Sequence, residues 1–133
     1  MSVWKNLGKF VKDAWTEGVE SARPKQWAGK LIQLDLAPAR GLQKERKKAT
    51  GGKDAKVVWV KFARDASAKK VFVLAHDGGH RLGELILDDH PEVTGALDSG
   101  VNIGACFIAN DDGVWGAKLR LGDHRYNPKP FWK

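Results

Sequence analysis

Two kinds of hydrophobic spacing meet near Pro24. Before it, hydrophobic residues from Val3 to Trp15 recur three and four positions apart, with charged residues mostly between them. This spacing is typical of an amphipathic helix, which we assign to residues 1–24. The helix is expected to end at Arg23-Pro24, because proline and the residue before it disfavour helical geometry. Its apolar face could pack against the rest of the domain, a second copy of the chain, or a membrane surface. The mixed charges favour the first two.

After Pro24, short apolar runs and period-two alternation predict strands. Glycine pairs, Asp-Gly-Gly and Asn-Asp-Asp-Gly separate the runs and supply turn residues. The pattern predicts a mainly β (α+β) domain over residues 25–122, in the form of a small six-stranded antiparallel barrel or a strongly curved sheet. The expected strands are residues 29–36, 56–62, 69–75, 80–87, 102–109 and 114–121.

One segment interrupts the strands, DDHPEVTGALDSG at residues 88–100. An aspartate can cap a helix that has Pro91 in its first turn, and Val93, Ala96 and Leu97 then share one face. The Ser99-Gly100 step predicts the end of the helix. We therefore expect one short inserted helix.

His76 and His80 flank Asp77-Gly78-Gly79, which raises the question of a metal or catalytic site. Glycine tolerates the positive φ of a tight turn, and the flanking apolar runs predict the strands of a hairpin. Zinc needs three or four ligands, and the other histidines, Cys106 and the carboxylates show no metal-binding spacing. We therefore predict a turn, without metal, cofactor or enzymatic activity. Catalysis by residues dispersed along the sequence stays open.

Composition is that of a globular protein. The chain has 133 residues, of which 42% are hydrophobic and 29% charged, enough for one domain with short appendages. Cys106 lies in an apolar run and is expected to be buried and reduced. No run of about 18 apolar residues predicts a membrane span, and no secretory signal is recognisable. We therefore expect a cytoplasmic protein.

Positive charge is concentrated in residues 40–56, which contain seven basic and two acidic residues and supply +5 of the net +7. Such a segment attracts polyanions, because each neutralised phosphate releases counterions. A solvated loop or short helix that serves solubility is the alternative. The candidate phosphate contacts in this segment are Lys44, Arg46, Lys47 and Lys48.

The order FARDASAKKV (62–71), hairpin, HRLGEL, short helix and NIGACFI resembles the HIRAN domain over roughly residues 28–121. That family's pattern is Asn-Pro-Tyr-Asp-x-Asn-Ala-Ile-x-Val, followed by Gly-Tyr-Leu. Asp65, Ala68 and Val71 match it, and Leu82-Gly83-Glu84-Leu85 occupies the place of Gly-Tyr-Leu. Departures from the pattern include Phe62, Arg64, Lys69 and Glu84, which stand for asparagine, tyrosine, isoleucine and tyrosine.

The resemblance implies an OB-like barrel that binds the 3′ end of single-stranded DNA. Asp65 would match the acidic residue that accepts a hydrogen bond from the terminal hydroxyl. Arg64 would stack on a base in place of the missing tyrosine, since a guanidinium plane can do so. For Asp65 the alternative is a turn residue that bonds its own backbone.

Further candidates surround this segment. Lys61, Lys69, Lys70 and Arg81 flank the same strand ends, and Trp59 shares one face of its strand with Lys61. Trp59 is a possible stacking platform, but we favour a buried anchor for it, and core positions for Trp27 and Trp115. The aromatic tail, residues 123–133, either packs back on the domain, as we favour, or offers a second stacking surface.

The sequence favours a nucleic-acid-binding module, for single-stranded DNA or 3′ ends, of the kind used in DNA repair or replication. The alternative is a protein-interaction domain that oligomerises or binds a partner through its N-terminal helix and tail, with basic charge serving solubility. A membrane-surface adaptor is the third interpretation.

Overall fold

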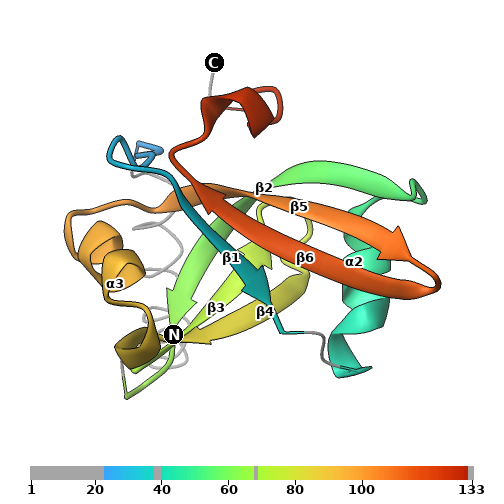
Figure 1. Ribbon diagram of the computed structural model, residues 1–133, viewed down its shortest axis with the longest axis horizontal. Coiled ribbons are helices and arrows are strands. Elements are labelled where there is room, and N and C mark those ends of the chain that lie inside the picture. Colours follow the sequence, from blue (N-terminus) through green and yellow to red (C-terminus); the bar gives the residue numbers. More distant parts are fainter. Residues whose placement is uncertain (1–22, 38–39, 68, 132–133) are drawn as a thin grey trace, which may run out of the picture.

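The structure is a computed structural model, which describes residues 23–37, 40–67 and 69–131 (Figure 1). The predicted N-terminal helix and the last two residues of the tail lie outside the described residues. Within the described residues, no helix is long and apolar enough to cross a membrane.

Six antiparallel strands form one sheet that curls into a half-barrel (Figure 1). Each predicted run overlaps one strand, and two of the strands extend beyond their runs, so the prediction of a mainly β domain with six strands is confirmed. The order across the sheet is β1-β6-β5-β2-β3-β4, which leaves β1 and β4 at its two edges. The strands are β1 (Ile32–Leu36), β2 (Ala55–Arg64), β3 (Lys70–Ala75), β4 (Arg81–Ile86), β5 (Ile103–Asp111) and β6 (Val114–Leu121).

Helices α2 (Gln43–Ala49) and α3 (Pro91–Asp98) lie at opposite ends of the half-barrel (Figure 1). The inserted helix predicted at residues 88–100 is α3, which follows the 3-10 turn η2 (Leu87–Asp89). The predicted aspartate cap is wrong: His90 is the N-cap residue and makes no side-chain capping bond. The basic segment begins with the 3-10 turn η1 (Arg40–Leu42) and continues into α2, so it contains a short helix.

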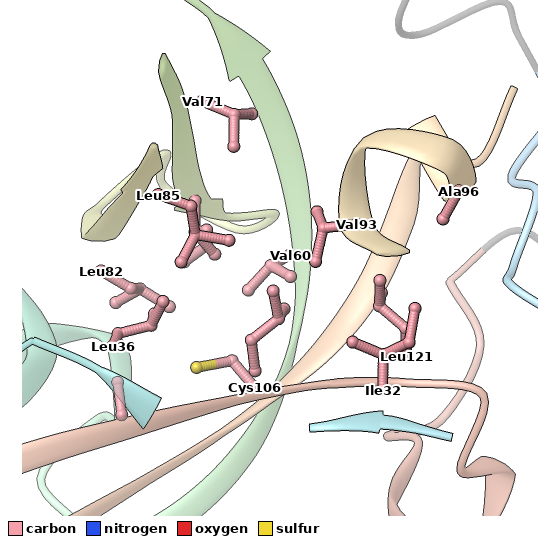
Figure 2. Packing of buried hydrophobic residues seen from close by; sticks show 14 of the residues in the cluster. Ile32, Leu36, Val60, Val71, Leu82, Leu85, Val93, Ala96, Cys106 and Leu121 are labelled. Atoms are coloured by element: carbon pink, nitrogen blue, oxygen red, sulfur yellow. The ribbon is translucent and has the colours of Figure 1, made fainter. Parts of the chain in front are cut away.

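The core lies inside the half-barrel, because alternate residues of each strand point inward. Figure 2 shows Val60 and Cys106 beside residues of β4, while Val93 and Ala96 of α3 face the end formed by β1 and β6. Val60 and Cys106 are completely buried. Burial raises the pKa of the Cys106 thiol to about 12, so this cysteine is a small buried apolar residue, as predicted.

The HDGGH motif is the turn of the β3–β4 hairpin, as predicted. Gly78 and Gly79 have φ angles of 78° and 66°, values that glycine adopts without strain. The backbone N–H of Ala75 donates to the carbonyl of His80 at 2.7 Å and begins the ladder. Across the described ranges, no group of three or more histidines, cysteines or carboxylates is placed to hold a metal ion.

The open seam between β1 and β4 is bridged by Arg46 of α2. Its Nε and two Nη atoms donate to the carbonyls of Leu82, Trp115 and Ala37 at 2.8, 2.8 and 2.7 Å. Leu82 is the extra residue of a bulge in β4, because Val73 pairs with Gly83 and Leu74 with Arg81. Arg46 is 0% exposed. The expectation that Arg46 contacts phosphate is therefore wrong, because its guanidinium is buried and donates to three carbonyls at the seam.

Candidate nucleic-acid interface

Three strands bring several predicted binding residues onto one outward face. Lys61 of β2 lies opposite Leu74 of β3, which lies opposite Arg81 of β4. Two positions along β3, Phe72 lies opposite Glu84, and the next outward pair is Lys70 and Ile86. Because side chains alternate between the two faces of a sheet, these residues share the face away from the core. We call this surface the basic face: Lys61, Lys70, Phe72, Leu74, Arg81, Glu84 and Ile86.

The basic face combines positive charge with partly exposed apolar side chains. The guanidinium carbon of Arg81 lies 4.1 Å from the ring centroid of Phe72. Lys70 Nζ lies 3.6 Å from Glu84 Oε2, in a pair whose side chains are 37% and 47% exposed. Such an exposed pair is weak, so Lys70 can exchange Glu84 for another anion at little cost. Three cations face one carboxylate here, and Phe72 and Leu74 provide apolar surface between them.

Trp59 is also on the outer side of β2, but the tail covers it. Its side chain is 7% exposed and its Nε1–H donates to the carbonyl of Lys129 at 3.0 Å. This agrees with the favoured interpretation of Trp59 as a buried anchor, and we leave it out of the candidate interface. Trp115 is buried in the core as expected, and Trp27 packs against the core while partly exposed.

The described part of the tail, residues 123–131, packs on the outer side of the sheet. The Arg120 guanidinium lies 3.8 Å from the ring centroid of Tyr126, and Phe131 stacks on His76 with centroids 3.8 Å apart. Asp123, at the base of the tail, accepts hydrogen bonds from the Arg125 backbone and guanidinium, and these contacts lower the pKa of its carboxyl. The expectation that the tail packs back is therefore confirmed for these residues.

Arg64 and Asp65 lie at the end of β2, toward α3. Arg64 Nη2 makes an ion pair of 2.7 Å with Asp98 Oδ1. Asp65 Oδ1 accepts a hydrogen bond of 2.9 Å from Ser67 Oγ, which lowers the pKa of the carboxyl, and a longer one from the Lys70 N–H. These contacts are those of a turn residue, the alternative interpretation for Asp65. Lys69, in the same turn, is exposed.

The lysines of α2 adjoin the basic face at its other end. His80 Nδ1 lies 3.2 Å from Glu45 Oε1, which ties α2 to the residue before Arg81. Lys44, Lys47 and Lys48 are all exposed. Lys48 is only loosely paired with Glu45, at 3.9 Å. Three of the four predicted phosphate contacts in the basic segment are thus accessible, and the fourth, Arg46, is not.

Sequence reasoning missed a cavity of about 330 Å³ beside the basic face. It joins the start of β2, the end of β3 and the tail, and the lysines at its rim are Lys56 and Lys129. Seventy-three positions separate these two lysines in the chain. The concentration of aromatic residues in the tail was the only available signal, and it did not show which strand the tail would cover.

No family model matches this chain, and comparison with the curated proteins and with the solved structures gives no significant match.

Proposed function

We propose that the protein is a nucleic-acid-binding module that binds single strands, with DNA as the preferred partner. The observation that supports this most directly is the basic face. Lys61, Lys70 and Arg81 come from three strands and surround Phe72 and Leu74. Single-strand binding uses cations that follow the phosphate backbone beside rings on which bases stack, and here Phe72 is the ring of the face, with the Arg81 guanidinium over it.

The same proposal includes the finer description of the fold as an OB-like barrel related to HIRAN domains. The curled half-barrel is compatible with that shape, and the matching residues Asp65 and Val71 support the relation. End recognition through Asp65 is a separable part of the proposal. It requires Asp65 to accept a terminal 3′-hydroxyl in addition to its bonds within the turn, and capping the strand with a 3′-phosphate would then weaken binding.

The test is a titration of a fluorescently labelled single-stranded oligonucleotide across a series of salt concentrations. The variant carries Lys61→Gln, Lys70→Gln and Arg81→Gln. If the three cations contact phosphates, the variant should bind more weakly. Its slope of log affinity against log salt should fall by about 2, since each phosphate contact contributes about 0.7 for single strands. Sequence should make little difference to the loss.

The matched control carries Arg23→Gln, Lys30→Gln and Lys118→Gln, which removes the same charge from positions outside the basic face. It should keep nearly the slope of the unaltered protein. Equal losses in both variants would show that only net charge matters, and no binding by the unaltered protein at low salt would refute the proposal. If the protein is instead a protein-interaction domain that oligomerises, we expect no oligonucleotide binding at low salt and an oligomeric mass in solution.

A further inference from the structure

The cavity beside the basic face has an apolar interior. The side chains that line it include Val57 and Val58 of β2, Ala75 of β3, and the rings of Trp59 and Phe131. Its volume of about 330 Å³ is near the lower end of the range of small-ligand sites, roughly 300–1,000 Å³. A cavity of this size suits one flat ring system with a small substituent. Apolar and aromatic walls are the surroundings in which such rings stack.

The rim of the cavity is charged. Lys56, Lys129 and Asp77 line it, and all three residues are exposed. None of these three side chains makes an ion pair within the part of the chain that the structure describes. An ammonium group binds phosphate as a point charge, while a carboxylate accepts hydrogen bonds from sugar hydroxyls or amino groups. The rim therefore offers groups for both the phosphate and the sugar or base of a nucleotide.

The cavity is continuous with the basic face. Trp59 lies two positions before Lys61 on the same side of β2, and His76, two positions after Leu74, follows the end of β3. Ala49, at the end of the basic helix α2, also lines the cavity. The Trp59 side of the cavity therefore adjoins the basic face, whereas Lys56 alternates to the opposite side of β2.

We infer that this cavity binds one nucleotide, with the base among the apolar side chains and the phosphate at Lys56 and Lys129. The nucleotide is either a free mononucleotide or one residue of a bound strand. The second source rests on the proposed function, whereas the first does not. Asp65 and the β2–β3 turn are not part of this site.

The probe is adenosine 5′-monophosphate, added to ¹⁵N-labelled protein and followed by two-dimensional NMR. The Trp59 indole N–H, which donates to the Lys129 carbonyl at 3.0 Å, reports from the cavity wall. The mononucleotide should shift this resonance in a saturable way, and adenosine or inorganic phosphate alone should bind at least tenfold more weakly. A short single strand should shift the same resonance.

Two variants change the cavity in different ways. Val57→Phe fills the cavity without altering its charge. Lys56→Gln with Lys129→Gln removes the two cations of the rim without filling the cavity. Each should weaken mononucleotide binding about tenfold, the scale of one lost stacking or charged contact. Lys30→Gln with Lys118→Gln, at an exposed and a half-buried lysine elsewhere, is the charge-matched control. Circular dichroism checks that each variant is folded. If Val57→Phe does not fold, the double lysine variant alone tests the nucleotide site.

The outcomes separate the two proposals. Strand binding that depends on Lys61 and Arg81 but not on the cavity variants, with no shift from the mononucleotide, would overturn the nucleotide site and leave the proposed function standing. Mononucleotide binding that the cavity variants weaken, without any strand binding, would support the site and refute the proposed function. A cavity that responds only to strands, and loses about tenfold in Val57→Phe, would support the site as a base pocket of a bound strand.

Discussion

Replacing Arg46 by methionine should destabilise the domain by more than any change of an exposed charge. Methionine keeps much of the length and apolar stem of arginine but none of its donors. The Trp115 carbonyl would keep a hydrogen bond from Gln43 Nε2 at 2.9 Å, so the loss falls mainly on the carbonyls of Leu82 and Ala37.

The size of the effect follows from those two acceptors. A buried polar group left without its partner costs about 1–3 kcal/mol, which applies in full to the Leu82 carbonyl, whereas water can reach the carbonyl of the exposed residue Ala37. Part of this is recovered, because methionine does not have to be desolvated as a charge, and that desolvation also lowers the pKa of the Arg46 guanidinium. We expect a net loss of about 2 kcal/mol from a total stability of about 5–15 kcal/mol.

Urea unfolding, followed by far-ultraviolet circular dichroism, measures the free energy of unfolding. Arg46→Lys keeps the charge but replaces a planar group that reaches three carbonyls by a single ammonium, so it should fall between methionine and the unaltered protein. Arg40→Met, at an exposed arginine of η1, is the control and should change stability by less than about 0.5 kcal/mol. A loss below about 1 kcal/mol in Arg46→Met would refute the role of Arg46 in closing the seam.

Two further predictions concern the seam and the tail. Gly83→Ala should destabilise the domain by about 1–3 kcal/mol in urea unfolding, because a Cβ there would lie 2.8 Å from Leu36 Cδ1 across the seam. Gly95→Ala is the control and should not destabilise the domain, since a Cβ there meets no atom within 4 Å. The carboxyl of Asp123 has a lowered pKa, chiefly because the Arg125 guanidinium donates a hydrogen bond to it. Its contribution to stability is therefore complete above the unfolded pKa of about 3.9 and is lost as the pH falls through the lower folded pKa. Asp123→Asn should therefore lower the melting temperature at pH about 6 and converge with the unaltered protein in acid, below the folded pKa; an equal difference at all pH values would contradict this.

The sequence by itself determined the strands, the hairpin turn and the inserted helix, because these depend on local rules. Alternating apolar residues define one buried face of a strand, and Gly78 and Gly79 permit a backbone that most residues avoid. Even there the helix cap was misassigned, since His90 and Asp89 are adjacent and only the backbone path decides which residue precedes the first turn.

Tertiary structure alone decided which of the basic residues can bind a ligand. Arg46 has the same local surroundings as Lys47 and Lys48, three cations in a row, and the winding of α2 turns only Arg46 toward the seam. The cavity likewise depends on contacts across the chain, because Lys129 reaches Trp59 only when the tail folds back over β2. Periodicity assigns residues to faces of one element, but the pairing of distant elements determines whether a face is buried, covered or open.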